Sequence, residues 1–210
     1  MARTKLDYKQ LVKNYPILTE QMTKQRLEVI LAKLNEVLKD DIPGEVVELG
    51  CYSGTTSLFL RRLLDLYNSN KQLHVYDSFS GLPDKTIKDA SVTGSDFKAG
   101  ELKASKRELI KNFKRSGLTL PYIHKGWFYD LKDKDIPEEI SFAFLDGDFY
   151  NSIMESLLIV WPRLNHNGQI IIDDYEKNNL PGVSRAVNEF FHDKDIAVSL
   201  QKDLAIIKRT

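Results

Sequence analysis

Residues 45–54, EVVELGCYSG, decide the fold: an apolar run ends at Leu49 and passes into a turn with a glycine at each end. Gly50 and Gly54 can adopt backbone conformations that other residues resist, and the amides of the following helix are free to face a ligand. The stretch is typical of the strand–turn–helix that opens a nucleotide-binding sheet. A turn with a purely structural role would have the same pattern, so the motifs elsewhere in the chain are needed to decide whether this turn binds a ligand.

The spacing of this turn argues against a dinucleotide. It reads Gly-x-x-x-Gly, and Tyr52 stands where the dinucleotide fingerprint has its middle glycine, so a pyrophosphate lying against the backbone would be obstructed. Glu48, immediately before the turn, is placed to support the loop and to receive an ammonium group.

Apolar patterning around the turn predicts alternating strands and helices. We expect strands over residues 45–49, 73–76, 122–124, 141–145 and 169–172, a closing hairpin over 196–200 and 204–207, and helices over 22–38, 55–67, 106–115, 150–161 and 183–191. This alternation predicts an α/β fold with a doubly wound, mostly parallel, seven-stranded sheet and an antiparallel C-terminal edge. Residues 1–210 are expected to form a single domain, with an N-terminal helical segment over 1–44. Residues 80–105 are polar and long for a connection, which predicts a lid-like loop.

Composition excludes several classes of partner. Thirty basic and thirty acidic residues cancel, so nothing global recruits nucleic acid or an anionic membrane. The chain begins without the apolar region of a secretory signal and lacks a run long enough to span a membrane, which predicts a cytoplasmic protein. Cys51 is the single cysteine and lies within the turn, where a packing role is favoured over a nucleophile.

Carboxylates follow three of the predicted strands. Asp77 ends the second strand, where an acid commonly holds a ribose diol. Asp146, Asp173 and Asp174 follow two later strands, and three such oxygen donors match Mg²⁺ or a similar hard cation. Without a cation, three unpaired carboxylates packed together would repel one another.

Structural roles remain open for each of these residues. Asp77 would also serve to cap the turn at residues 78–83, Asp146 would fit an Asp-Gly-Asp turn, and Asp173 and Asp174 a helix-capping loop. His124, beside the loop at residues 125–127, is the one histidine considered near the site, and a structural role is favoured even for it.

The chain resembles the macrocin O-methyltransferase (TylF-like) family. The resemblance is carried by motifs in a fixed order: VELG at 47–50, DSFSGLP at 77–83, GEL at 100–102, NF at 112–113, GWF at 126–128, LDGDFYNS at 145–152, PRL at 162–164 and DDY at 173–175. It runs from about Glu45 to Phe191. Thr55, where relatives often have a second glycine, and a short N-terminal segment depart from the family pattern.

This resemblance implies a class I fold, S-adenosylmethionine as methyl donor, and Mg²⁺-dependent methylation of a sugar hydroxyl on a glycosylated natural product. By position, it implies that Asp146, Asp173 and Asp174 are metal ligands and that Asp146 is also the base. It assigns the cofactor pocket to Glu48, Gly50, Ser53, Asp77, Ser78, Gly126 and Trp127.

A chelating cation and in-line methyl transfer would then favour a vicinal diol as acceptor. The rival readings are a nicotinamide-dependent oxidoreductase, which would share the sheet and Asp77, and a non-catalytic cofactor-binding module. A homo-oligomer also stays open.

Overall fold

The structure, a computed structural model, describes residues 7–91 and 97–210. Its main elements are α1 (Tyr8–Asn14), α2 (Lys24–Lys39), β1 (Glu45–Leu49), α3 (Thr55–Leu66), β2 (Leu73–Asp77), α4 (Lys106–Arg115), β3 (Tyr122–Lys125), β4 (Ile140–Leu145), α5 (Tyr150–Val160), β5 (Leu164–Ile172), α6 (Pro181–Phe191), β6 (Val198–Gln201) and β7 (Leu204–Lys208). Short 3-10 helices occur at η1 (Ile87–Asp89), η2 (Phe128–Asp130), η3 (Asp133–Asp135) and η4 (Trp161–Arg163).

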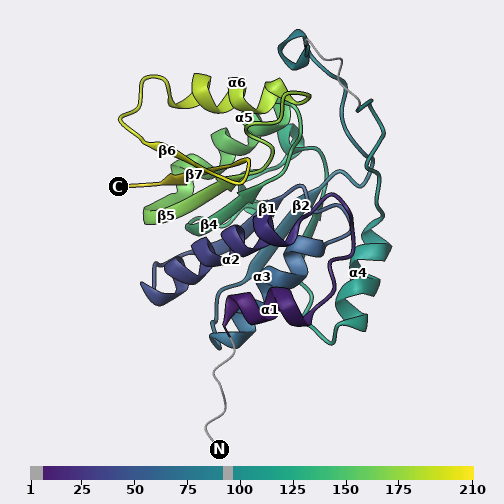
Figure 1. The fold of residues 1–210 in the computed structure, drawn as a ribbon, viewed down its shortest axis with the longest axis vertical. Helices are drawn as coiled ribbons and strands as arrows, with labels where there is room; N and C mark the ends of the chain where they lie inside the picture. The colour runs from purple at the N-terminus through teal and green to yellow at the C-terminus, as the bar shows by residue number, and fades with distance from the viewer. Residues whose placement is uncertain (1–6, 92–96) are drawn as a thin grey trace, which may run out of the picture.

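The seven strands form one sheet in the order β3-β2-β1-β4-β5-β7-β6 (Figure 1). The first five run parallel, whereas β7 pairs antiparallel with β5 and with β6. The predicted doubly wound sheet with an antiparallel C-terminal edge is confirmed. The strand order reverses between β1 and β4, and the crevice at the carboxyl ends of such a pair is where open α/β sheets bind ligands.

Helices cover both faces of the sheet. Side chains alternate along each strand, so Val46 and Val75 pack toward α1–α4, and Val47 and Leu49 pack toward α5 and α6. Figure 1 shows α5 and α6 on the opposite side of the sheet from α2 and α3. Because both faces are buried, the central strands carry apolar residues at nearly every position.

The N-terminal segment contains two helices where one was predicted. The predicted helix corresponds to α2, which starts at Lys24 because the Thr23 hydroxyl accepts a hydrogen bond from the Arg26 amide at 3.2 Å. The additional α1 has seven residues and buries only Leu11 and Val12, too short a pattern to give a helical period.

Strand β5 starts earlier than predicted. The apolar run indicated residues 169–172, but pairing with β4 begins at Leu164 opposite Ile140, followed by a register shift before Phe142 pairs with Gln169. The residues between Leu164 and Gln169 are polar and mostly partly exposed, so their sequence resembles that of a turn. The register shift of the β4–β5 pair falls in this segment.

The predicted lid-like loop is fixed at two points. The Gly100 amide donates to the carbonyl of Leu82 at 2.9 Å, and the Leu82 amide donates to the carbonyl of Glu101 at 2.9 Å, which closes the base of the loop. Asp89 is buried, and its carboxylate accepts hydrogen bonds from the Tyr150 amide at 2.7 Å and the Thr86 amide at 2.8 Å. η1 is therefore docked on the N-terminus of α5. Residues 92–96 of the predicted lid lie outside the described residues, and closure over bound substrates stays a prediction.

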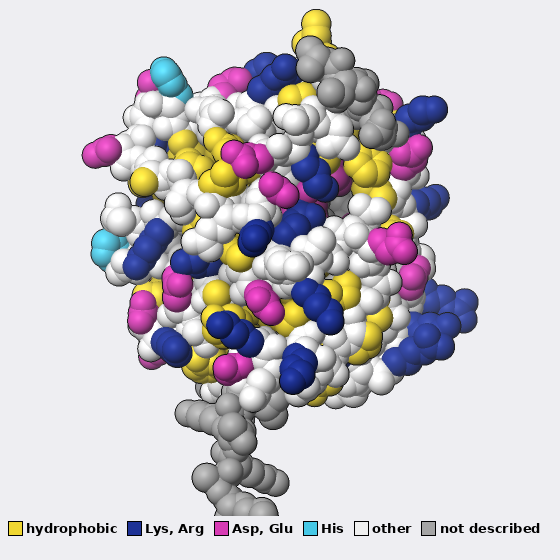
Figure 2. Space-filling view, viewed as in Figure 1, with side chains coloured by type: hydrophobic (Ala, Val, Ile, Leu, Met, Phe, Trp, Pro, Cys, Tyr) yellow, Lys and Arg dark blue, Asp and Glu magenta, His cyan; other side chains and the backbone are white. Residues whose placement is uncertain are grey.

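Charged side chains of both signs are interspersed on the face seen in Figure 2, with basic side chains gathered over α4. Lys111 and Lys114 of α4 are exposed, as expected for a solvated helix face. Among the described residues, no helix is both long and apolar enough to cross a membrane.

Candidate active site

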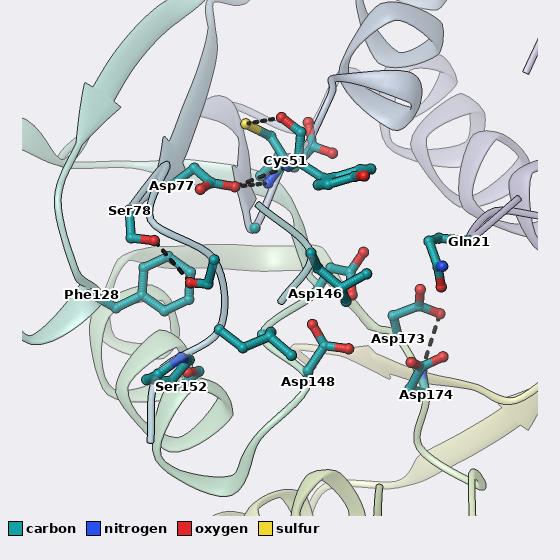
Figure 3. A pocket seen from close by; sticks show the side chains of 18 of the residues that line it. Gln21, Cys51, Asp77, Ser78, Phe128, Asp146, Asp148, Ser152, Asp173 and Asp174 are labelled. Carbon is teal, nitrogen blue, oxygen red and sulfur yellow. Dashed lines mark hydrogen bonds between the residues drawn. The ribbon is translucent and has the colours of Figure 1, made fainter. Parts of the chain in front are cut away.

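One pocket lies over the carboxyl ends of β1, β2, β4 and β5, at the reversal of the strand order. Every candidate site residue from the sequence lines it: Glu48, Gly50, Ser53, Asp77, Ser78, Gly126, Trp127, Asp146, Asp173 and Asp174. Figure 3 shows two ends. Asp77, Ser78 and Phe128 lie toward one side, and Asp146, Asp148, Asp173, Asp174 and Gln21 toward the other.

The glycine turn joins the two ends of the pocket. Gly50 has φ +90°, and a Cβ atom there would overlap the backbone carbonyl oxygen of Asp146. The Asp146 amide in turn donates to the carbonyl of Leu49 at 2.8 Å. The turn after β1 and the acidic loop after β4 are thus in backbone contact, and glycine is required for that contact.

Asp77 organises this turn through hydrogen bonds. One carboxylate oxygen accepts from the Cys51 amide at 3.0 Å and the Tyr52 amide at 2.9 Å, and the other accepts from the Phe79 amide at 2.7 Å. Asp77 therefore caps the turn that follows β2, as the structural alternative held, and also fixes the conformation of the glycine turn across the sheet.

Two hydroxyl groups at the start of α3 have no hydrogen-bond partner among the described residues. Ser53 Oγ and Thr55 Oγ1 are buried, and both residues line the pocket. Buried polar groups are normally paired, so these hydroxyls are available to a ligand at the helix N-terminus. Thr55, the departure from the family pattern, thus adds a polar group to the pocket.

Glu48 forms a buried acid beneath the turn. Its carboxyl group accepts a hydrogen bond from Ser57 Oγ, and burial raises its pKa to about 8 against the opposing effect of that bond. Glu48 is therefore largely neutral at pH 7 in the free protein. A cation arriving next to it would favour the ionised form.

The acidic end holds a fourth carboxylate that the sequence interpretation did not include. Burial, reinforced by the charge of Asp174, raises the pKa of Asp146 to about 7. Burial, reinforced by Asp146, holds the pKa of Asp148 well above its usual range. In both acids, burial and a neighbouring carboxylate favour the protonated form.

Basic side chains pair with the carboxylates that were expected to be unpaired. The guanidinium of Arg26 in α2 contacts the carboxylates of both Asp173 and Asp174, and Lys177 Nζ lies 2.7 Å from Asp174 Oδ1. Within residues 7–91 and 97–210, no three His, Cys, Asp or Glu side chains are grouped so as to hold a metal ion. Arg26 and Lys177 relieve the repulsion between Asp173 and Asp174, so the expectation that all three carboxylates would be unpaired is wrong for these two. The charge of Asp174 still raises the pKa of Asp146.

The sequence carried a signal for Arg26 that was missed. Arg26 lies four residues before Ile30 and four after Met22, so it interrupts the apolar stripe of the predicted helix with a charge. A buried arginine of this kind needs a carboxylate partner. Asp148 had a signal too, since it shares the Asp-Gly-Asp motif with Asp146.

Two residues considered in the sequence have structural roles. His124 does not line the pocket; its Nε2 lies 3.2 Å from Nδ1 of His74, and its ring stacks on Tyr76 at 4.5 Å. Cys51 is buried in the core, and burial raises the pKa of its thiol, which keeps it protonated.

Comparison with known proteins agrees with this geometry. The family model for macrocin O-methyltransferase (TylF) matches residues 2–206. The chain is 31% identical over 186 residues to mycinamicin III 3''-O-methyltransferase of Micromonospora griseorubida, covering 84% of this chain and 72% of the relative. It is 28% identical over 203 residues to demethyldecarbamoylnovobiocin O-methyltransferase of Streptomyces niveus, covering 89% and 74%.

Among solved structures, that of the O-methyltransferase NovP superposes with a TM-score of 0.77 at 26% identity, covering 89% of this chain and 80% of NovP. The match to the family model spans nearly the whole chain, including the glycine turn and Asp146, Asp148, Asp173 and Asp174. The chain therefore belongs to the macrocin O-methyltransferase (TylF) family and is an O-methyltransferase.

Proposed function

We propose that this O-methyltransferase moves a methyl group from S-adenosylmethionine to a sugar hydroxyl of a glycosylated small molecule. The observation that carries the proposal is a pocket with two chemically different ends. One end offers a glycine turn, free hydroxyls and Glu48, and the other offers ionisable carboxylates. Relatives named for mycinamicin III, demethyldecarbamoylnovobiocin and a rhamnosyl tetracenomycin support a glycosylated acceptor.

The first end suits the methionine and ribose parts of the donor. Glu48 would accept the ammonium group, and the hydroxyls of Ser53 and Thr55 would bind the carboxylate at the N-terminus of α3. Asp77 would hold the ribose from the opposite strand, with Ser78 beside it, and Gly126 and Trp127 would border the adenine.

The second end suits the acceptor. The sulfonium methyl is reactive by itself, so the protein has to position the acceptor oxygen and remove its proton. Asp146 is the proposed base, because a carboxylate with a pKa near 7 can accept a proton at neutral pH and still be ionised in half of the molecules. A nicotinamide-dependent oxidoreductase has no need of this acid, and family membership excludes that reading.

We further propose a Mg²⁺ requirement. Carboxylate oxygens are the ligands that Mg²⁺ prefers. In this structure the guanidinium of Arg26 contacts Asp173 and Asp174, so a positive charge already occupies the position proposed for the ion. Asp146, Asp173 and Asp174 would hold the ion, although they are not grouped around one point in the arrangement described above. Bound there, Mg²⁺ would supply Lewis-acid stabilisation of the ionised acceptor oxygen.

The assay for this function uses methyl-labelled S-adenosylmethionine and a panel of glycosylated metabolites with vicinal diols, read by mass spectrometry. We expect transfer to a sugar hydroxyl in Mg²⁺ buffer, loss of turnover with EDTA, and recovery when Mg²⁺ is added. Full turnover in chelated protein would contradict the metal requirement, whereas labelling of aglycone hydroxyls alone would contradict the sugar acceptor.

Replacing Asp77 by alanine should weaken S-adenosylmethionine binding by about 1–3 kcal/mol, the range for leaving buried polar groups unpaired. Three backbone amides would lose their acceptor, so the glycine turn should loosen together with the proposed ribose site. Calorimetry of cofactor binding and urea unfolding measure the two effects. Unchanged affinity in a stable Asp77→Ala protein would place the ribose elsewhere.

A further inference from the structure

Arg26 connects the N-terminal segment to the acidic end of the pocket. It lies in the first turn of α2 and is 6% exposed. Its Nη2 contacts Oδ1 of Asp173 and Oδ1 of Asp174, which are 147 and 148 residues away in the chain. One nitrogen thus lies between two carboxylate oxygens, the position that a small cation bridging them would take.

The remaining nitrogens of Arg26 are weakly held. Nη1 donates to the carbonyl of Gln21 at 3.2 Å, and Nε is buried with no hydrogen-bond partner among the described residues. In a guanidinium whose role is purely structural, we would expect Nε to donate a hydrogen bond as well. The Arg26 side chain is therefore held mainly by the carboxylates of Asp173 and Asp174. If another cation bound to these carboxylates, Arg26 would lose most of the interactions that hold it in place.

Lys177 also pairs with Asp174, but it differs from Arg26. It contacts Asp174 and not Asp173, and 32% of its side chain is exposed. Lys177 can move into solvent at little cost, whereas Arg26 cannot leave without changing its contact with the carbonyl of Gln21. Gln21 and its neighbours Thr19 and Met22 line the pocket.

We infer that Arg26 and a divalent cation are alternative occupants of the Asp173–Asp174 carboxylate pair, so that Arg26 sets the affinity of the site for the cation. Arg26 holds the pair together in the metal-free protein and has to be released when the cation binds. Because Arg26 also contacts Gln21, cation binding loosens residues 19–26, of which Thr19, Gln21 and Met22 line the pocket. The inference rests on the proposed function in assuming that these carboxylates take a cation.

The first experiment measures Mn²⁺ binding, since Mn²⁺ prefers the same oxygen ligands as Mg²⁺ and its free form is quantified by electron paramagnetic resonance. We expect Arg26→Gln to bind Mn²⁺ at least about tenfold more tightly than the unmodified protein, because a competing charge in contact with both carboxylates is removed. Lys24→Gln is the matched control: it makes the same charge change on an exposed residue of the same helix turn, and its affinity should stay within about twofold. Equal or weaker Mn²⁺ binding by a folded Arg26→Gln protein would overturn the inference.

A second measurement keeps the inference testable if Arg26→Gln does not fold. In the unmodified protein, hydrogen exchange of residues 19–26 should become faster when Mg²⁺ saturates the site, because the Arg26 contacts are released. Unchanged or slower exchange at a Mg²⁺ concentration that calorimetry shows to be saturating would overturn it.

The two proposals fail in different ways. If Arg26→Gln binds Mn²⁺ more tightly but the unmodified protein transfers no methyl group to any of the glycosylated metabolites, the proposed function alone would be contradicted. An active methyltransferase whose Mn²⁺ affinity is the same with and without Arg26 would contradict the competition alone.

Discussion

Replacing Asp146 by asparagine should lower kcat by about 10²- to 10⁴-fold, the usual contribution of a general base, while S-adenosylmethionine binding stays nearly unchanged. Asparagine keeps the shape of the side chain and cannot accept the proton of the acceptor hydroxyl. The proposed cofactor contacts come from the ends of β1, β2 and β3 and the start of α3, so they should not depend on this carboxylate. Single-turnover kinetics and cofactor calorimetry on the same preparation measure both properties.

Asp148→Asn is the matched control for this substitution. Asp148 lies two residues away and lines the same pocket, and burial raises its pKa well above the usual range, which favours the neutral form that asparagine mimics. We expect Asp148→Asn to retain most of the activity. A loss as large as that of Asp146→Asn would identify Asp148 as the base and contradict the role given to Asp146.

The pH profile gives an independent check on the base. Burial raises the pKa of Asp146 to about 7 in the metal-free protein, and a Mg²⁺ ion bound to this carboxylate would lower it. A base works only when ionised, so kcat/KM should fall on the acid side, with the inflection below pH 7, and level off above it. Asp146→Asn should remove this inflection. An acid-side inflection that is the same in Asp146→Asn as in the unmodified protein would argue against Asp146.

The strands and most helices could be predicted because their signals are local. The sheet follows from apolar runs that end at Leu49, Asp77, Leu145 and Ile172, and the order of parallel strands restricts which ends can meet. Because the carboxyl ends of parallel strands lie at one edge of a sheet, the sequence alone also predicted that Asp77, Asp146, Asp173 and Asp174 lie in one pocket.

What the sequence could not give were pairings over long separations. Arg26 reaches Asp173 across 147 residues, Asp89 reaches the Tyr150 amide across 61, and Asp77 reaches the Tyr52 amide across 25. In each case the charged residue was visible, but its partner depends on how layers pack, which local patterns do not encode. The expectation that Asp173 and Asp174 would be unpaired failed for this reason, since their partner Arg26 lies in a helix at the other end of the chain.

Replacing Gly50 by alanine should destabilise the protein by about 3 kcal/mol or more and abolish cofactor binding and turnover together. The backbone at Gly50 has φ +90°, and an added Cβ would meet the carbonyl group of Asp146, with the carbonyl carbon at 2.8 Å. Backbone atoms cannot rotate away as a side chain can. The carboxyl ends of β1 and β4 would therefore have to separate, which moves the cofactor turn and the proposed base at once.

Gly100→Ala separates this steric effect from the cost of a left-handed backbone. Gly100 has φ +82°, and no heavy atom lies within 4 Å of a Cβ added there, so its substitution should cost only the conformational strain of about 1–2 kcal/mol. Urea unfolding and cofactor calorimetry of the two variants should therefore differ sharply. If Gly50→Ala were as stable as Gly100→Ala and still bound S-adenosylmethionine, the close contact between the two strand ends would not be what holds the pocket together. If it lost binding while remaining folded, the loss would lie in the turn itself, because the proposed role of Asp146 is to act on the acceptor and not to bind the methionine end of the donor.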